Sequence, residues 1–259
     1  MAEGPVLSGV RRSSQRSDTP PARPAEIALS RPAVERQTED VRYLVVGAGG
    51  HAQEVAWSLR EHERGRGSPC ELLFFDDALA PGPLASGLGT IVGPLDAVPD
   101  HADRRGSLLV LGVGLPQLKV QITERLAATG LAWATVVHPR ATIGPNVEIG
   151  AGSYVAAGAI VTVNVRIGAF ATINMHAQVA HDGVVEAFAT LHPNAHVAGG
   201  VRIGEGAELG TGAVVIPGLT IGAWAALGAG AVAVESLAGG RTYVGVPARP
   251  VVPAARRSA

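Results

Sequence analysis

The 259-residue chain has one cysteine, one lysine and few aromatic residues, and each shortage excludes a class of protein. The single Cys70 cannot form an intramolecular disulfide, so we expect no disulfide scaffold and a reducing, cytoplasmic location. The net charge of -1 provides no basic surface for nucleic acid or an anionic membrane. No apolar run is long enough to cross a bilayer, and the N-terminus lacks the apolar stretch of a signal peptide.

Small and aliphatic residues are plentiful instead. The chain holds 34 glycines, and hydrophobic residues make up 47% of it while aromatic residues make up only 4%. A core of aliphatic and small side chains suits thin repeated layers better than one bulky globule. Residues 1–40 are rich in Ser, Pro and Arg without periodicity, which predicts a disordered leader.

Residues 41–134 alternate between predicted strands and helices. Apolar runs over 42–47 (RYLVVG), 71–77 (ELLFFDD) and 107–114 (SLLVLGVG) are typical of buried parallel strands. A glycine loop opens a helix after the first strand, and Gly130 closes a second helix that begins near Leu115. We expect LAWATVV, residues 131–137, to be a last strand. The pattern predicts a small parallel α/β layer.

Residues 135–237 form a six-residue repeat. Every sixth residue from Val137 to Leu227 is Val, Ile or Leu, and the fifth position of each hexad is mostly Ala, Ser or Gly. A helix cannot keep one face at a period of six. A triangular coil can, because three hexads make one turn with the aliphatic side chains inside. The repeat therefore predicts a parallel β-helix, followed by a C-terminal tail over 238–259.

The period of three hexads shows which residues lie above one another. His181 falls on a corner of the coil, and Gly199 stands one full turn further on, with a backbone N–H that has no side chain to cover it. An imidazole base beside an open amide suits acyl transfer, and Asp182 can orient the ring. The same spacing also fits a solvated His–Asp pair on a corner, so the pattern leaves both interpretations open.

The loop Gly47–Ala52 (GAGGHA) follows a strand and opens a helix. Such a loop can hold a phosphate at the helix N-terminus, and it can equally be a tight strand-to-helix turn. His51 lies within it and can touch a phosphate or sugar. Asp76 and Asp77 end the second predicted strand, where they can accept hydrogen bonds from a base or ribose, or cap a helix.

The chain resembles the sialic acid O-acetyltransferase and UDP-4-amino-sugar N-acetyltransferase family of hexapeptide-repeat enzymes over about residues 42–250. The motifs that carry the resemblance are YLVVGAGGHAQEV, LLFFDD, HPRATIGPNVEIG, IN..AQVAHD at Ile173–Asp182, and GAVVIPGLTIG…LGAGAV…YVGVPARPV. The resemblance implies a Rossmann-like nucleotide-sugar-binding domain over 41–134 and a left-handed β-helix acyltransferase domain over 135–237. The implied assembly is a homotrimer with active sites between adjacent β-helices.

The resemblance also implies an activity and its residues. An amine or hydroxyl of a nucleotide-linked sugar would attack acetyl-CoA directly, with His181 as general base and Asp182 as its acidic partner, and without a metal. The family binds the nucleotide sugar at the positions of Gly49, Gly50, His51, Asp76, Asp77 and Gly114. It binds acyl-CoA at the positions of Thr190, Gly199, Thr211 and Ala229. Relatives often carry a histidine where Thr190 stands here, and the only lysine, Lys119, lies outside the repeat.

Two alternatives belong to other classes. His176 and His181 have the spacing found in zinc-dependent carbonic anhydrases with this β-helix, but the position two turns before His176 is Arg140 instead of a third histidine. The chain would also fit a non-catalytic trimer that only binds a nucleotide sugar. Metal analysis tests the first alternative, and thiol release from acetyl-CoA tests the second.

Overall fold

The computed structural model describes residues 41–67, 70–103 and 106–251, all of which fall within one compact unit of the chain. The predicted leader, residues 1–40, and the end of the predicted tail, residues 252–259, lie outside the described part. No helix of the described residues is long and apolar enough to cross a membrane.

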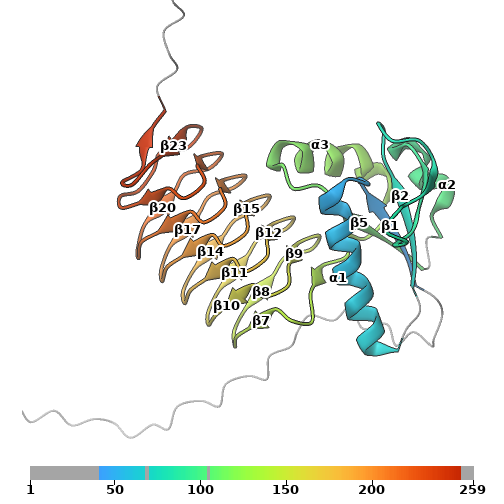
Figure 1. Ribbon diagram of the computed structural model, residues 1–259, viewed down its shortest axis with the longest axis horizontal. Helices are drawn as coiled ribbons and strands as arrows, with labels where there is room; N and C mark the ends of the chain where they lie inside the picture. Colours follow the sequence, from blue (N-terminus) through green and yellow to red (C-terminus); the bar gives the residue numbers. More distant parts are fainter. Residues whose placement is uncertain (1–40, 68–69, 104–105, 252–259) are drawn as a thin grey trace, which may run out of the picture. The chain divides into compact units, whose positions relative to one another are not determined.

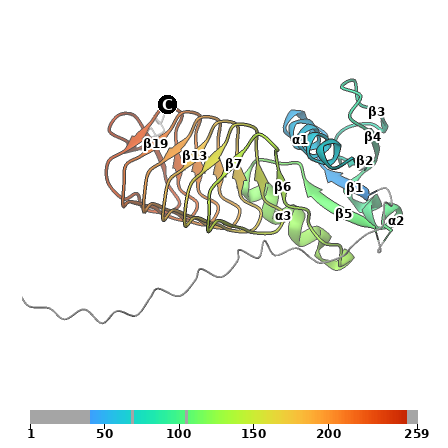
Figure 2. The same ribbon diagram turned by 90° about the horizontal axis from the view of Figure 1, so that it is seen from below.

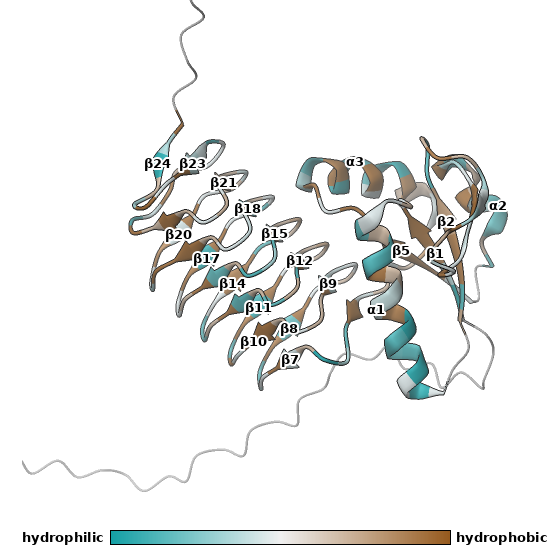
Figure 3. Ribbon diagram, in the orientation of Figure 1, coloured by the Kyte–Doolittle hydropathy of each residue, from teal (hydrophilic) through white to brown (hydrophobic). Residues whose placement is uncertain are grey.

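The part of the chain before the repeat forms an α/β layer (Figures 1 and 3). Its sheet has the order β3-β4-β2-β1-β5, in which only β3 is antiparallel to its neighbour. The strands are β1 (Val41–Val46), β2 (Cys70–Phe75), β3 (Gly82–Pro83), β4 (Thr90–Gly93) and β5 (Ser107–Leu111). Leu44, Val45 and Val46 are fully buried, as expected for a central strand covered on both faces.

Two long helices accompany this sheet, α1 (Gly50–Arg66) and α3 (Pro116–Leu126). Gly67 ends α1 in a left-handed conformation, and Gly130 does the same after a short 3-10 turn, η2 (Ala127–Thr129). The connection from β4 to β5 carries two short elements, η1 (Leu95–Ala97) and α2 (Val98–His101). The predicted strands over 42–47, 71–77 and 107–114 are therefore all present.

Three features of this layer differ from the prediction. Strands β3 and β4 were not expected, because such short runs between glycines and prolines carry no periodicity. The expected last strand, LAWATVV, is divided between two sheets. Trp133 makes one isolated bridge to Leu109 of the α/β sheet, whereas β6 (Val136–Val137) already pairs with the first coil of the repeat.

The repeat winds as a parallel β-helix of short strands, which Figures 1 and 2 show stacked as successive coils. Face 1 consists of β6, β9 (Tyr154–Val155), β12 (Thr172–Ile173), β15 (Thr190–Leu191), β18 (Glu208–Leu209), β21 (Ala226–Leu227), β23 (Thr242–Val244) and β24 (Arg249–Pro250). Face 2 consists of β7 (Thr142–Ile143), β10 (Ile160–Val161), β13 (Gln178–Val179), β16 (His196–Val197), β19 (Val214–Val215) and β22 (Val232–Ala233). Face 3 consists of β8 (Glu148–Ile149), β11 (Arg166–Ile167), β14 (Val184–Val185), β17 (Arg202–Ile203) and β20 (Thr220–Ile221).

The register confirms the predicted period. Ile160 pairs with Gln178, and Gln178 pairs with His196, so residues three hexads apart are neighbours in adjacent coils. The architecture fits a left-handed parallel β-helix. Short corners join the faces: edge 1–2 includes 192–195, 210–213 and 228–231, edge 2–3 includes 144–147, 162–165, 180–183 and 198–201, and edge 3–1 includes 168–171 and 186–189. Edge 2–3 is therefore opposite face 1.

The interior of the β-helix is aliphatic. The second residue of each strand from β9 to β22 points inward and is buried, and small residues such as Ala159, Ala177 and Ala195 fill the corners beside them. Ile143, in the first coil, remains 37% exposed because no preceding coil covers face 2 there. At the other end, β23 and β24 extend face 1 into the predicted tail, where Tyr243 is buried.

Buried polar contacts join the α/β layer to face 1. Ser58 Oγ of α1 lies 2.8 Å from the hydroxyl of Tyr154. Lys119 of α3 is fully buried and donates to Thr172 Oγ1 and Thr190 Oγ1, each at 2.8 Å, and to the carbonyl of Phe170 at 3.1 Å. Thr190 in turn donates to the carbonyl of Gly114 at 2.7 Å. These bonds fix the loop after β5 against the β-helix.

Candidate active site

His181 and Asp182 occupy a corner of edge 2–3, between β13 and β14. Asp182 has a φ of 58°, a left-handed conformation that Asp adopts more readily than most residues. Its Oδ2 lies 2.8 Å from His181 Nδ1. Hydrogen bonds from His181 and from Asn164 lower the pKa of Asp182, so it is a carboxylate that only accepts. Nδ1 must then carry the proton, which leaves the lone pair on Nε2.

Gly199 lies on the next coil, directly against the His181 ring. A Cβ built on Gly199 would stand 2.5 Å from Nε2 of His181 and 2.6 Å from Cε1, so a larger residue would displace the ring. Among the residues that the structure describes, the Gly199 amide donates to no backbone carbonyl. The basic nitrogen and an unused amide thus lie on adjacent coils, as the count of three hexads predicts.

The glycine loop follows β1 at the carboxyl edge of the α/β sheet. Gly47, at φ 93°, turns the chain and donates to the carbonyl of Phe75 at 2.8 Å. Gly49 is the N-cap of α1, and neither Gly49 nor Gly50 has an atom within 4 Å of the position where a Cβ would stand. The backbone at the start of α1 is therefore open to a ligand, and the helix N-terminus favours a negative charge there.

His51 is the second residue of α1, within this loop, and its imidazole is neutral at neutral pH. Burial lowers its pKa to about 4, with further lowering from Lys119 and His192. Its ring packs edge-on against Tyr154 and approaches Gly114, and its Nε2 is buried without a hydrogen-bond partner. His51 can therefore offer a hydrogen bond to a sugar or phosphate, but it cannot offer a positive charge.

The two acidic residues after β2 have different partners. Asp76 Oδ2 accepts from the amide of Ala48 at 2.9 Å, which ties the glycine loop to the end of β2. Asp77 accepts from the amide of Leu95 at 3.0 Å and forms an ion pair with Arg125 at 2.6 Å. Asp76 therefore shapes the glycine loop directly, whereas Asp77 links the loop after β4 to α3.

The remaining predicted residues lie on other parts of the β-helix. Thr190 is on face 1, buried beneath Gly114 and Lys119, so its hydroxyl already has partners. Thr211 and Ala229 are on edge 1–2, one coil apart, where the carbonyl of Thr211 accepts from the amide of Gly230 at 2.8 Å. One chain therefore brings His181, Asp182 and Gly199 together, but it does not bring them to the glycine loop or to edge 1–2.

Sequence reasoning missed two polar groups near these residues. Asn146 and Asn164 continue the line of Asp182 along edge 2–3. His192 Nε2 pairs with Glu208 Oε1 at 3.2 Å on the side of face 1 that carries Thr190. The asparagines could have been found from the sequence, because they recur at the period of the coil. The pair of His192 and Glu208 has no such periodic signal.

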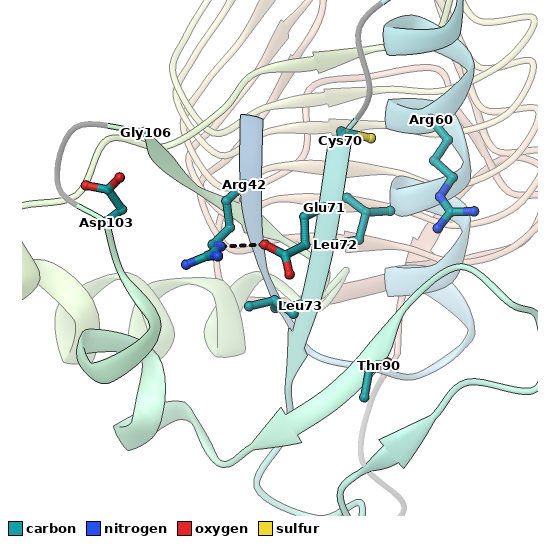
Figure 4. Close-up of a pocket in the computed structure, with 9 residues that line it drawn as sticks. All are labelled: Arg42, Arg60, Cys70, Glu71, Leu72, Leu73, Thr90, Asp103 and Gly106. Carbon is teal, nitrogen blue, oxygen red and sulfur yellow. Dashed lines mark hydrogen bonds and ion pairs between the residues drawn. The ribbon is translucent and has the colours of Figure 1, made fainter. Parts of the chain in front are cut away.

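The described residues also form two hollows on the surface. A cavity of about 680 Å³ is lined by Arg42, Cys70, Glu71 and their neighbours, and Figure 4 shows Arg42 paired with Glu71. It lies at the amino ends of β1 and β2, opposite the glycine loop, and borders segments outside the described residues. A groove of about 310 Å³ runs over face 2 past Gln178, Ala180 and His196, beside the corner of His181. The described residues contain no cluster of three metal-binding side chains.

Comparison with known proteins agrees with this architecture. Residues 182–217 match the family described as bacterial transferase hexapeptide (six repeats). The acetyltransferase domain of PglB from Neisseria gonorrhoeae is 33% identical with a TM-score of 0.76, over 82% of this chain and 100% of that one. Perosamine N-acetyltransferase from Caulobacter crescentus, solved with CoA and GDP-perosamine, is 34% identical with a TM-score of 0.73, over 81% and 96%. WeeI from Acinetobacter baumannii is 29% identical with a TM-score of 0.72, over 82% and 100%.

The comparison with curated proteins gave no match. The fold and the hexapeptide match define the class, a hexapeptide-repeat transferase. The similarity extends over both the α/β layer and the β-helix, at 33% identity to one relative and 34% to another. The chain therefore belongs to the family of sugar O- and N-acyltransferases that includes sialic acid O-acetyltransferases and UDP-4-amino-sugar N-acetyltransferases, and it is an acyltransferase.

Proposed function

We propose that this protein transfers the acetyl group of acetyl-CoA to an amine or hydroxyl of a nucleotide-linked sugar, with His181 as general base. One observation carries the proposal: the His181 ring lies between the Asp182 carboxylate, at Nδ1, and Gly199 of the next coil, at Nε2. The relatives solved with acetyl-CoA, or with CoA and GDP-perosamine, support the choice of substrates.

The geometry suggests how the transfer would run. Nε2 of His181 takes a proton from the acceptor group as that group attacks the thioester carbonyl. The Gly199 amide donates to the oxygen on which negative charge develops. The carbon–sulfur bond then breaks, and the CoA thiolate leaves with the proton held on the imidazolium. Asp182 keeps the ring in the correct tautomer and stabilises its transient positive charge.

For the acceptor, we propose that residues 41–134 act as a Rossmann-like nucleotide-sugar-binding domain. The open backbone at Gly49 and Gly50 supports a phosphate site at the start of α1. His51 and Gly114 would contact the sugar side of that ligand, since the His51 ring lies against Gly114. Asp76 would act mainly by holding the loop, and Asp77 by its pair with Arg125.

The proposed site would be completed by a second copy of the chain. Within one chain, His181 is on edge 2–3, which is opposite the face against which Gly114 is fixed. We therefore propose a homotrimer in which His181 and Gly199 of one copy meet Thr211, Ala229 and the glycine loop of the next, with 135–237 as the acyltransferase domain. Thr190 would act indirectly, because its hydroxyl bonds to Lys119 and Gly114 and so holds the loop after β5 against face 1. We also propose a cytoplasmic location, which suits the free Cys70.

Two measurements test this function. A thermal-shift screen of nucleotide sugars should find a ligand, because a ligand at one hundred times its dissociation constant adds about 2.7 kcal/mol to the free energy of unfolding. With that acceptor, thiol release from acetyl-CoA should fall roughly a hundred-fold or more in His181→Ala. His62→Ala, on α1, is the matched control. Near-normal turnover in His181→Ala would remove this residue from the mechanism.

A further inference from the structure

Three polar residues form a line along edge 2–3 that ends at His181. Asn146, Asn164 and Asp182 follow one another at the period of the coil, and all three adopt the left-handed conformation, with φ of 55°, 57° and 58°. Asn146 Nδ2 donates to Asn164 Oδ1 at 2.8 Å. Asn164 Nδ2 donates to Asp182 Oδ1 at 3.2 Å, and Asp182 Oδ2 accepts from His181. The line therefore joins three successive coils to the imidazole.

The chemistry of the line fixes its direction. The Asp182 carboxylate can only accept, so the amide of Asn164 must turn its NH2 group toward it. The carbonyl oxygen of Asn164 then faces Asn146 and accepts a hydrogen bond from its NH2 group. Asn and Asp also tolerate the left-handed corner conformation, so these residues serve the fold and the hydrogen bonds together.

We propose that Asn164 is a positioning residue for His181, a role that rests on the acetyl transfer proposed above. The His181 and Asp182 side chains are 64% and 59% exposed, so water competes for both oxygens of the carboxylate. Asn164 holds Oδ1, which leaves Oδ2 directed at Nδ1 of the imidazole. The ring then keeps its Nε2 against Gly199 instead of rotating into solvent.

The test compares two glycine substitutions at equivalent corners. Asn164→Gly and Asn146→Gly both replace a left-handed asparagine on edge 2–3, but only the first removes the contact with Asp182. We expect kcat to fall roughly ten-fold in Asn164→Gly, the factor expected for one hydrogen bond to a charged group, with KM for acetyl-CoA unchanged. Asn146→Gly should lose no more than about two-fold, since the bond from Asn164 to Asp182 survives. Both variants should still unfold cooperatively on heating, which would show that the corner remains folded.

A second variant gives a readout that a purely structural role would not move. Asn164→Asp places another carboxylate beside Asp182, which favours the protonated imidazole, so the acid limb of kcat/KM against pH should move to higher pH. In Asn164→Gly the limb should move to lower pH, because the contact between Asp182 and the ring loosens. Equal losses of kcat in the two glycine variants, or an unmoved limb in folded Asn164→Asp, would overturn the positioning role.

The two proposals fail in different ways. An active His181→Ala would disprove the general base and with it the acetyl-transfer mechanism. An inactive His181→Ala with Asn164→Gly and Asn146→Gly behaving alike would leave the mechanism intact and disprove only the role of Asn164.

Discussion

Nζ of Lys119 in α3 donates to Thr190 Oγ1 in β15 at 2.8 Å, and the hydroxyl of Thr190 donates its own proton to the carbonyl of Gly114. These two side chains thus join the loop after β5 to β15, the third strand after β6 along face 1. Both are buried, Lys119 completely and Thr190 to 1% exposure. Thr190 therefore acts as part of the domain junction in this chain.

We expect Lys119→Met to destabilise the protein while leaving the β-helix intact. Methionine fills a similar volume but leaves the acceptors at Phe170, Thr172 and Thr190 without their donor, and a buried group without a partner costs about 1–3 kcal/mol. Urea denaturation should show a lower free energy of unfolding for the variant. Leu118→Ala, at an exposed position of the same helix, is the control. An unchanged stability in Lys119→Met would show that the junction does not depend on these bonds.

Gly199→Ala should reduce turnover by roughly a hundred-fold without preventing folding, because a Cβ 2.5 Å from Nε2 must displace the His181 ring. The clash also predicts a loss of stability, measured by thermal denaturation. In a His181→Ala background, Gly199→Ala should reduce the stability less, because the imidazole that its Cβ would displace is absent. Equal stability losses in the two backgrounds would mean that the alanine is strained for another reason.

The period of the repeat made most of the β-helix predictable. Each coil repeats the same local choice, an aliphatic residue inside and a small one at the corner, so a count of three hexads placed Gly199 against His181. The same count would have placed Asn164 one coil before Asp182. It could not place Lys119, because no local pattern links a lysine in α3 to threonines that lie far along the chain in separate coils. Strands β3 and β4 were not predicted either, because β4 is held by its pairing with β2 and β3 by its pairing with β4, and neither pairing leaves a periodic pattern in the sequence.

The substitution Asp182→Asn tests whether the negative charge of Asp182 contributes to turnover. Asparagine tolerates the same left-handed corner, so the backbone should be unaffected. The amide can no longer stabilise an imidazolium and can donate to Nδ1, which favours the wrong tautomer, so we expect kcat to fall at least roughly ten-fold. Unchanged KM values for both substrates would confirm that binding survives. Wild-type turnover would show that the charge has no part in the reaction.

Removal of metal should leave the activity unchanged. Catalytic zinc needs three protein ligands, and the position two coils before His176 is Arg140 instead of a third histidine. We expect the purified protein to contain far less than one zinc per chain, and thiol release to persist after dialysis against a chelator. Loss of activity that added zinc restores would instead favour the metalloenzyme alternative.

The buried His51 predicts a loss of stability in acid. Its folded-state pKa of about 4 lies below the value of about 6.5 for an unfolded chain, so between these values the unfolded state takes up a proton that the folded state excludes. The free energy of unfolding should therefore fall as the pH drops from about 6.5 to about 4. In His51→Gln this fall should be smaller by about 3 kcal/mol, whereas between about pH 7 and 8 the two proteins should have parallel stability curves. Urea denaturation across this range measures both limbs, and identical curves would show that His51 accepts a proton as readily in the folded protein as in the unfolded chain.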